Sequence, residues 1–505
     1  MRTGYTLALR PDAVEDPEAL FKHLEDSLGD SVSLDKAKFF TAVEKKGDPY
    51  EEIAVRVPKE TGEQLLEEKL PGLIVVRDKW RFYPGDSLAS QVLGFVGFGP
   101  NNPNSVEGVY GLEKYWNDTL SRSDDDLYVN FFAEVFGNLQ ALVANNASVR
   151  EGDVITTINA DVQSQLESVI RKVQSTYQAQ LTGGVVMDPK TGEIIAMAST
   201  PSFNPNEYAS ATSTALYRNP VVENEYELGS IMKPITMASG IDAGVVTPES
   251  TYHDPGCVKK GGITICNYDS RSRGYGVSMQ EVLNQSLNTG VVHVVDELGE
   301  ETFAKYLHAF GMGEETGVDL PNEVPGHIAA YETGSEADYA SASFGQGFAV
   351  TPLAMARALA VLANGGMLVT PHVAKAVHSP GGITRELYHP DGGRVISKDT
   401  AETISRMLVT VYDDALLVGA VKKEHYSIAA KTGTAQMANP NGGGYYTDRY
   451  LHSFFGYFPA YDARFIILLF TVDPRGEQYA SHTLTYPFVD LVDFLINYYD
   501  IPPDR

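Results

Sequence analysis

Three short motifs, placed far apart along the chain, constrain its fold more than any other feature. They are Ser-x-x-Lys at 230–233, Ser-x-Asn at 286–288 and Lys-Thr-Gly-Thr at 431–434. The first follows Gly229, which permits a tight turn into a helix. Its serine and lysine fall three residues apart on one helical face, so a nucleophile lies beside a possible base. If the three motifs serve one site, the fold must bring three distant segments together.

A second copy of each motif occurs, at 33–36, 202–204 and 190–192. These copies run in a different order, because the Lys-Thr-Gly copy precedes the Ser-x-Asn copy. The copy at 190–192 is the predicted turn of a hairpin, and the copy at 33–36 is expected to be an exposed, charged turn. Order and spacing therefore favour Ser230 as the functional serine.

The residue types in the three motifs suit the activation of a serine. A serine hydroxyl is a poor nucleophile until a base removes its proton, and a lysine is a competent base only when its pKa falls toward neutrality. Burial and a second cation both lower the pKa of a lysine, so we predict Lys233 as the base and Lys431 as the cation that keeps it neutral. We expect Ser286 to relay a proton between the lysines and Asn288 to hold Lys233 or a substrate peptide carbonyl. These four residues and Ser230 are the predicted catalytic residues.

The third motif is predicted to bind substrate through Thr432, Gly433 and Thr434. The two threonine hydroxyls can receive a substrate carboxylate, while Lys431 supplies positive charge. The backbone N–H groups of Ser230 and Thr434 are expected to form an oxyanion hole. In the opposing interpretation the second motif caps a loop and the third is a simple turn, which does not account for the order of the motifs.

Composition narrows the classes of function. The chain has 39 Lys and Arg against 66 Asp and Glu, and this net charge of -27 opposes non-specific binding to nucleic acid or anionic lipid. The 11 histidines are scattered without a metal-binding pattern, so no metal site is expected. A histidine-dependent serine hydrolase is disfavoured, because Ser230 lies in no Gly-x-Ser-x-Gly elbow and no histidine is near it in the chain. The hairpin-like setting of Cys257 and Cys266 allows a disulfide in an oxidising compartment, and two free thiols fit equally well.

The length of 505 residues is enough for several folded units, and a change in sequence character indicates two domains. We place them at 1–149 and 150–505. The first is predicted to be a small α+β domain, with strands at 39–43 and 53–57 and a helix at 59–70.

The second domain is predicted to be an antiparallel sheet covered by helices. A hairpin is expected over 184–197, where two apolar runs flank a Pro-Lys-Thr-Gly turn. Apolar strands are expected at 453–458 and 465–472, and a final helix at 485–498. Thr-Pro at 351–352 provides the cap and the first turn of a further helix. Because strands occur at both ends of this region, its N- and C-terminal pieces are expected to share one sheet.

With these motifs in place, the chain resembles the class B penicillin-binding proteins, which are monofunctional peptidoglycan D,D-transpeptidases. The ordered triplet is typical of penicillin-binding proteins and serine β-lactamases. Arg-Phe-Tyr-Pro-Gly at 81–85 and Gly-Val-Tyr-Gly-Leu-Glu at 108–113 are similar to the family's junction with its N-terminal pedestal. Asp-Pro-Lys-Thr-Gly-Glu-Ile at 188–194 is similar to the start of the transpeptidase domain, and Phe-Gly-Gln-Gly at 344–347 to a segment that shapes the cleft.

The resemblance implies an α+β fold with two domains. A smaller α+β pedestal, similar to a dimerisation domain, would precede a penicillin-binding and serine β-lactamase-like transpeptidase domain with a flanked antiparallel sheet and a helical subdomain. It also implies that Ser230 attacks the penultimate D-Ala carbonyl of a stem peptide, releases D-Ala and passes the acyl group to an amine of a neighbouring stem. No metal or organic cofactor takes part. The implied partners are D-Ala-D-Ala donor and amine acceptor stem peptides, β-lactams, and divisome or elongasome membrane proteins at the N-terminal domain, with no nucleic acid.

Other activities of the same fold stay open at this point. They are a D,D-carboxypeptidase, in which water accepts the acyl group, a β-lactamase or β-lactam-binding sensor, and a catalytically inactive divisome scaffold. The pedestal-like first third of the chain favours the transpeptidase, and the competent residue at every motif position opposes the inactive scaffold.

The sequence departs from the family pattern in two respects. Members usually begin with a membrane-spanning helix, and residues 1–30 contain no apolar run long enough to be one. The resemblance implies a protein that acts at the extracytoplasmic face of the membrane, with its anchor missing from this sequence. Leu228 and Met232 stand where the family commonly has proline and an aromatic residue. We expect them to alter packing or β-lactam affinity rather than abolish activity.

Overall fold

The chain forms two compact units, Met1–Asp86 and Ser87–Arg505. The domain boundary expected at 149/150 falls outside the described residues. No helix in the described part of the chain is both long and apolar enough to cross a membrane. The computed structural model describes residues 1–29, 31–99, 102–121, 151–439, 442 and 444–505.

The first unit is a small α+β domain built on a three-stranded antiparallel sheet. Its central strand β1 (Arg2–Leu9) pairs with β2 (Glu51–Val57) on one side and with β3 (Leu73–Trp80) on the other. The strand and the helix predicted at 53–57 and 59–70 are therefore confirmed. The helices whose apolar side chains complete the core of this unit are α1 (Pro17–Leu28), α2 (Lys36–Glu44) and α3 (Lys59–Glu68).

The strand predicted at 39–43 is wrong, because this segment lies within helix α2. The side chain of Asp35 accepts a hydrogen bond from Lys38 N at 3.0 Å and caps the helix. Phe39 and Val43 then lie four residues apart on the buried side. A short apolar run fits a strand or a buried helix equally well, and here the cap and the packing decide for the helix.

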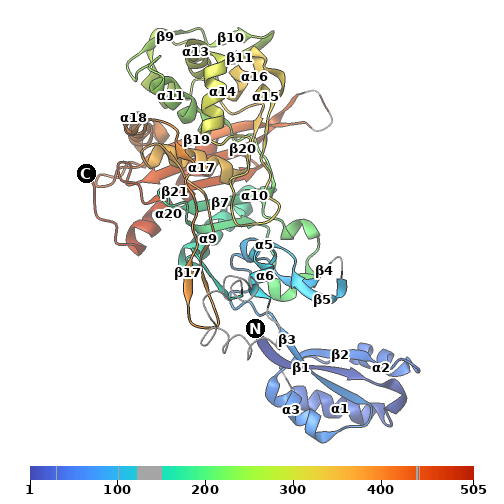
Figure 1. Ribbon diagram of the computed structural model, residues 1–505. Helices are drawn as coiled ribbons and strands as arrows, with labels where there is room; N and C mark the ends of the chain where they lie inside the picture. The colour runs from blue at the N-terminus through green and yellow to red at the C-terminus, as the bar shows by residue number, and fades with distance from the viewer. Residues whose placement is uncertain (30, 100–101, 122–150, 440–441, 443) are drawn as a thin grey trace. The chain divides into compact units, whose positions relative to one another are not determined.

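A five-stranded antiparallel sheet forms the centre of the second unit (Figure 1). Its strands are β7 (Leu181–Met187), β8 (Ile194–Thr200), β19 (Ala429–Ala438), β20 (Tyr445–Phe458) and β21 (Phe465–Val472). Their spatial order is β19-β20-β21-β7-β8. Because β21 pairs with β7, the early and late parts of this unit share one sheet, as the sequence predicts. The predicted hairpin over 184–197 is the β7–β8 pair.

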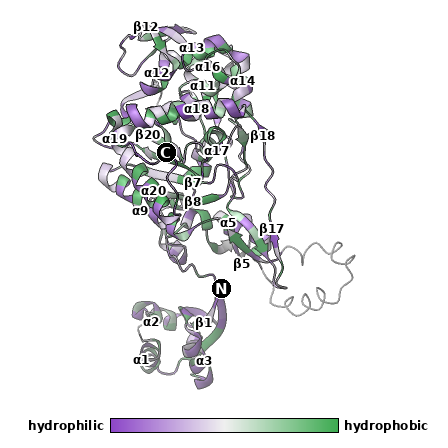
Figure 2. Cartoon of the chain, turned by 90° about the vertical axis from the view of Figure 1, so that its left-hand side faces the viewer, coloured by the Kyte–Doolittle hydropathy of each residue, from purple (hydrophilic) through white to green (hydrophobic). Residues whose placement is uncertain are grey.

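Both faces of this sheet are buried. Successive side chains of a strand point to opposite faces, so Ile467 and Leu469 of β21 enter one apolar core while Leu468 and Phe470 enter the other. In Figure 2 the strands around β7 and β8 are coloured as hydrophobic. The helices on the first face are α9 (Ala160–Tyr177) and α20 (Thr485–Tyr498), and those on the second are α17 (Pro352–Ala363) and α18 (Lys398–Thr410).

Two of these helices follow the predictions closely. α20 has the predicted bounds of the final helix. At the start of α17, the Thr351 hydroxyl accepts a hydrogen bond from Ala354 N at 3.0 Å, and Pro352 occupies the first turn. α17 is buried on nearly all sides, which explains its almost continuous apolar sequence.

A group of helices lies beyond α17 and α18, on the side of the sheet opposite to α9 and α20 (Figure 1). This group provides the second wall of the site described below. Its members are the 3-10 turn η4 (Gly229–Met232), α11 (Lys233–Asp242), α12 (Met279–Asn284), α13 (Asn288–Leu298), α14 (Glu300–Ala309), α15 (Ala329–Thr333) and α16 (Glu336–Ala342).

Two small antiparallel strand pairs accompany these helices. β9 (Thr251–Asp254) pairs with β12 (Gly274–Ser278), and between them β10 (Cys257–Lys260) pairs with β11 (Ile263–Cys266). Cys257 and Cys266 face each other in this register and form a disulfide, which decides between the two alternatives left open by the sequence.

Further α-helices and strands occur among the described residues of this unit. They are α4 (Ser90–Leu93), β4 (Val96–Gly99), β5 (Asn102–Gly108), α5 (Gly111–Tyr115), α6 (Asn117–Leu120), β6 (Asp153–Thr156), α10 (Pro220–Glu223), β13 (His327–Ile328), β14 (Phe348–Ala349), β15 (Met367–Leu368), β16 (Ala374–His378), β17 (Thr384–Glu386), β18 (Gly393–Arg394) and α19 (Ala480–Thr483).

Candidate functional site

Ser230 lies in the 3-10 turn η4, which leads directly into helix α11. Gly229 has a φ of +65°, a backbone conformation that glycine adopts without strain. Ser230 is partly exposed, whereas Lys233, the first residue of α11, is buried. Within the described residues the side-chain hydrogen bonds of Lys233 go to Ser286 rather than to the Ser230 hydroxyl. The turn thus presents the serine hydroxyl outward and directs the lysine inward.

Strand β19 packs directly against this turn. A Cβ at Gly433 would lie 2.3 Å from Ser453 Oγ and 2.5 Å from Leu228 O, so no other residue fits there without displacement. The Ser453 hydroxyl donates a hydrogen bond of 2.6 Å to the Leu228 carbonyl and fixes the turn to β20. A Cβ at Gly229 would lie 3.1 Å from Thr434 O. The close approach of these backbones brings the first and third motifs together.

The two motif lysines converge on Ser286. Lys233 Nζ donates to Ser286 O at 2.5 Å and to Ser286 Oγ at 3.1 Å. Lys431 Nζ donates to Ser286 Oγ at 3.0 Å and to Thr432 O at 3.1 Å. One hydroxyl therefore connects two amines from distant parts of the chain.

Both amines are in a poor environment for positive charge. Lys233 is 1% exposed and Lys431 is 3% exposed. Burial first, and the charge of Lys431 second, hold the pKa of Lys233 well below its usual value. Burial lowers the pKa of Lys431 from 10.5 to about 8. Two cations around one hydroxyl repel each other, and the arrangement favours a neutral Lys233 beside a charged Lys431.

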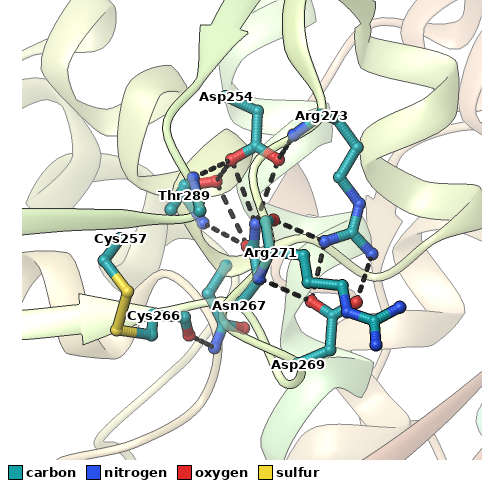
Figure 3. The surroundings of a disulfide bond; sticks show 10 residues. Asp254, Cys257, Cys266, Asn267, Asp269, Arg271, Arg273 and Thr289 are labelled. Carbon is teal, nitrogen blue, oxygen red and sulfur yellow. Dashed lines mark hydrogen bonds and ion pairs between the residues drawn. A yellow bond between two sulfur atoms is a disulfide. The ribbon is translucent and has the colours of Figure 1, made fainter.

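The second motif lies between α12 and α13 in an unusual backbone conformation. Ser286 has a φ of +54°, which is uncommon for a residue other than glycine and clusters at functional sites. Asn288 begins α13, and its Nδ2 donates a hydrogen bond of 2.8 Å to the carbonyl of Cys266. The disulfide joins Cys266 to the neighbouring strand (Figure 3). Asn288 is thus held by the cysteine hairpin rather than by Lys233.

A cleft of about 990 Å³ opens over these residues. On β19, Thr432, Thr434 and Gln436 are half-buried at every second position and line the cleft. Thr434 Oγ1 accepts a hydrogen bond of 3.0 Å from Ala480 N, which leaves its O–H free to donate to a ligand. Further lining residues come from both walls and include Ser230, Ser286, Asn288, Lys431, Tyr268 and Tyr479.

The segment 344–347 forms part of the same cleft, as the resemblance implies. A Cβ at Gly345 would lie 2.4 Å from Gly229 O, so this segment packs on the nucleophile turn. Gly347 N donates to Glu227 Oε1 at 3.0 Å, and the Tyr445 hydroxyl donates to the same oxygen at 2.9 Å. Burial raises the pKa of Glu227, whose Oε2 has no hydrogen-bond partner within the described residues.

All predicted site residues meet around this cleft. Lys233 and Gly433 lie behind its surface, and the other six line it. The second Ser-x-x-Lys copy is separate, since Ser33 and Lys36 are exposed on the first unit, as expected. The unusual neighbours Leu228 and Met232 are fully buried in the core beneath the turn.

Several contacts at the site were not foreseen from the sequence. They involve the Cys266 carbonyl, Glu227, Tyr445, Ser453 and the Ala480 amide. Only Glu227 lies beside a motif, and nothing in its neighbourhood distinguishes it from a surface carboxylate. The other groups reach the site from strands and turns far along the chain.

Comparison with known families identifies two domains. Residues 182–490 match the penicillin binding protein transpeptidase domain. Residues 2–157 match the penicillin-binding protein dimerisation domain.

Individual relatives agree with these matches. Stage V sporulation protein D of Bacillus subtilis is 30% identical over 498 residues, which cover 97% of this chain and 74% of that protein. Peptidoglycan D,D-transpeptidase FtsI of Escherichia coli is 26% identical over 458 residues, covering 90% of this chain and 73% of that protein. A crystal structure of penicillin binding protein 3 from Mycobacterium tuberculosis, complexed with ampicillin, superposes with a TM-score of 0.71 at 27% identity, covering 86% of this chain and 91% of that one. The chain therefore belongs to the class B penicillin-binding proteins, in which a dimerisation domain accompanies a transpeptidase domain.

Proposed function

We propose that this protein is a peptidoglycan D,D-transpeptidase that cross-links stem peptides through an acyl-enzyme on Ser230 and is inhibited by β-lactams. The observation that carries the proposal is the shared hydroxyl of Ser286, which lies within hydrogen-bonding distance of both buried lysines. That arrangement, beside a partly exposed serine in a large cleft, supplies a nucleophile, a neutral amine base and a fixed positive charge.

In the proposed first step, Ser230 Oγ forms a bond to the carbonyl carbon of the penultimate D-Ala, and Lys233 Nζ takes the hydroxyl proton. The bond to the nitrogen of the terminal D-Ala then breaks. The proton reaches that nitrogen by way of Ser286, so that free D-Ala leaves. The short distances from Ser286 Oγ to both amines support this relay.

In the second step an amine of a neighbouring stem attacks the ester carbonyl. It loses a proton to Lys233, the new amide bond forms, and the Ser230 oxygen leaves and recovers its proton. Backbone N–H groups of Ser230 and Thr434 would bind the carbonyl oxygen as negative charge develops. The close packing of β19 on the nucleophile turn, at Gly229 and at Gly433, supports this pairing.

The third motif is proposed to bind the substrate carboxylate. Thr432 and Thr434 project from the cleft side of β19, with Lys431 behind them as the source of charge. Because Thr434 already accepts a hydrogen bond from Ala480 N, its hydroxyl hydrogen is directed to the ligand. Gly433 allows the strand to approach the serine, and Asn288 positions the substrate peptide at the opposite wall.

We further propose that the pedestal extends over 1–149, with the transpeptidase domain over 150–505, and that the protein acts at the extracytoplasmic face of the membrane. Divisome or elongasome membrane proteins are the proposed partners of the pedestal. The dimerisation-domain match supports a role in association. A pull-down of the pedestal from detergent-solubilised membranes, compared with the intact protein, tests this assignment.

Labelling with a fluorescent penicillin tests the acyl-enzyme. We expect the wild-type protein to be labelled, Ser230→Ala to lose all label, and Lys233→Ala to fall by orders of magnitude. Ser33→Ala is the matched control, because it removes the serine of the second Ser-x-x-Lys copy, which is exposed. Label retained in Ser230→Ala would refute the proposed nucleophile.

A D,D-carboxypeptidase shares the acylation step and differs only in the acceptor. Incubation with a pentapeptide donor and an amine acceptor separates the two activities, because the cross-linked and the hydrolysed products differ in mass. We expect the cross-linked product to predominate. Hydrolysis without any transfer would favour the carboxypeptidase.

A further inference from the structure

We infer that Asp254 is a positioning residue for the second motif: its buried carboxylate sets the orientation of Asn267, which in turn caps helix α13 and holds Ser286 and Asn288 in place. This inference rests on the proposed function, because it assigns Ser286 and Asn288 to the catalytic machinery. Asp254 itself touches no substrate and lies behind the wall of the cleft, outside the three motifs.

Helix α13 needs a cap from elsewhere in the chain. The residue at its N-cap position is Leu287, whose side chain cannot accept a hydrogen bond. The first N–H groups of a helix lack intrahelical partners, and burial without a partner is costly. Thr289 N donates instead to Asn267 Oδ1 at 3.2 Å (Figure 3). Asn267 thus caps the helix from a non-local position, 22 residues away in the same chain.

The cap works only if the oxygen of the Asn267 amide faces α13. Asp254 enforces that orientation, because an ionised carboxylate accepts hydrogen bonds and does not donate them. Asn267 Nδ2 donates to Asp254 Oδ1 at 3.0 Å and to Oδ2 at 3.2 Å, which turns Asn267 Oδ1 toward Thr289. A reversed amide would place its oxygen against the carboxylate and its NH₂ against Thr289 N.

Asp254 is well suited to this task. It is 0% exposed, and its carboxylate accepts three more hydrogen bonds, from Gly256 N at 2.9 Å, Arg273 N at 3.0 Å and Thr289 Oγ1 at 2.8 Å. The bond to Thr289 Oγ1 attaches the carboxylate directly to α13. Gly256 follows β9 and Arg273 precedes β12, whereas Thr289 lies within α13, so the three donors reach the carboxylate from three separate segments.

The same loop holds the second motif at another point. Asn288 Nδ2 donates to the carbonyl of Cys266, the residue before Asn267, and Asn267 N donates to Gly256 O at 2.9 Å. The disulfide ties Cys266 to Cys257 on the neighbouring strand. Residues 266 and 267 therefore connect the buried carboxylate with the first two residues of α13.

The cap on α13 fixes the position of Ser286. It holds an uncommon backbone conformation two residues before Asn288 and carries the bonds to Lys233 and Lys431. Without Asn267, Thr289 N loses its acceptor. The start of α13 is then held by the bond of Asn288 to the Cys266 carbonyl and by the bonds of the Thr289 hydroxyl to Asp254 and Tyr252. Misplacement of catalytic groups by about 1 Å costs up to about a hundredfold in rate.

The test is the rate of acylation by a fluorescent penicillin, expressed per folded protein. In Asp254→Asn one carboxylate oxygen becomes an NH₂ group, which cannot accept the hydrogen bonds that Asp254 receives. Asn267 then loses the acceptor that fixes the orientation of its amide. We expect a decrease of about tenfold to a hundredfold and an altered pH dependence, because Ser286 no longer lies symmetrically between the lysines. The matched control is Asp319→Asn, which makes the same change at a carboxylate that is 5% exposed and accepts bonds from Val373 N and Ala374 N. We expect it to lower the melting temperature without changing acylation.

Two further variants keep the inference testable if Asp254→Asn does not fold. Asn267→Ala removes the cap while leaving the Gly256, Arg273 and Thr289 bonds to Asp254, and we expect the same loss of acylation. The reciprocal double variant D254N/N267D places a carboxylate oxygen, in place of the amide oxygen, opposite Thr289 N, and an amide at position 254 that can donate to this carboxylate. We expect it to recover acylation relative to the single variants.

Wild-type acylation that disappears in Ser230→Ala establishes the proposed nucleophile independently of these variants. If the wild-type protein is labelled at Ser230, the positioning role of Asp254 can be judged from its variants. It would be overturned if Asp254→Asn or Asn267→Ala showed the same acylation rate and pH profile as the control Asp319→Asn. Failure of the wild-type protein to be labelled would instead contradict the proposed function.

Discussion

Lys233 and Lys431 share one hydrogen-bond acceptor, the hydroxyl of Ser286, at 3.1 and 3.0 Å. The two lysines come from the start of α11 and from β19, on different walls of the cleft. Both are buried, so the desolvation of each and the repulsion between them act on the same equilibrium. Their protonation is therefore coupled, and the pair as a whole titrates with pH.

This pairing predicts a bell-shaped pH dependence for acylation. The rate should rise with pH as Lys233, whose pKa is held well below its usual value, becomes neutral and able to accept a proton. It should fall as pH rises through about 8, where Lys431 loses its charge. The second-order rate constant for labelling, measured across this range, checks the profile.

Lys431→Arg is the control for the alkaline limb, because arginine stays charged at these pH values. In that variant the fall near pH 8 should disappear, whatever the maximal rate. An unchanged alkaline limb would show that another group is responsible.

Lys431 is also predicted to lower the stability of the protein at neutral pH. The decrease of its pKa from 10.5 to about 8 corresponds to about 3 kcal/mol in favour of the unfolded state at pH 7. Lys431→Met removes this penalty but also removes hydrogen bonds to Ser286 and Thr432, worth about 1 kcal/mol each. We expect the variant to be more stable at pH 7 by about 1 kcal/mol, and to lose activity.

The sign of the pH dependence gives a sharper test. Between pH 8 and 10.5 the unfolded chain binds more protons at this lysine than the folded protein, so wild-type stability should rise with pH in this window. The free energy of unfolding of wild type and of Lys431→Met can be measured by denaturant unfolding at several pH values. As pH rises through this window, the difference should change in favour of wild type. A constant difference would contradict the burial of a titrating lysine.

Gly433→Ala should separate β19 from the nucleophile turn. The added methyl group would meet Ser453 Oγ and Leu228 O at 2.3 and 2.5 Å, and overpacking of this kind costs about 1–3 kcal/mol. We expect a lower melting temperature and much slower acylation. Gly97→Ala is the matched control, because its nearest neighbour would lie at 3.4 Å, an ordinary contact. Equal effects of the two substitutions would argue against a tight strand-to-turn contact.

Glu227 is predicted to make stability fall as pH rises. Burial raises the pKa of its carboxyl group, so above pH 4.5 the folded protein binds more protons here than the unfolded chain. Glu227→Gln keeps an oxygen for Tyr445 and Gly347 without a charge, and it should remove this part of the pH dependence. Glu227→Ala should lose both hydrogen bonds and about 1–2 kcal/mol. Unfolding free energies of the three proteins at mildly acidic and neutral pH distinguish these cases.

The elements that the sequence predicts correctly are determined by residues close together in the chain. The β7–β8 hairpin follows from two apolar runs around a turn, and α17 from a threonine cap with a proline behind it. The strand predicted at 39–43 is wrong because a short apolar run is compatible with a strand or a helix, and the cap from Asp35 selects the helix. Where short-range signals were ambiguous, packing against the sheet decided.

At the cleft, too, some residues could be predicted from the sequence and some contacts could not. The eight motif residues could be selected because their types and order are visible in the sequence. The cap that Asn267 supplies to α13 could not, because it depends on contacts among Asp254, Asn267 and Thr289 that no short-range pattern encodes. The same holds for the contact of Gly433 with Leu228, which exists only once β19 lies against the turn.

By itself, the sequence determined which reactive groups this protein has, in what order they occur, and which segments form local helices and hairpins. The tertiary structure alone decided that Lys233 and Lys431 meet at Ser286, away from water, and that Asn288 is held by the cysteine loop. The physical reason is that pKa values and side-chain orientations depend on burial and on neighbouring charges, which come from segments far apart in the chain.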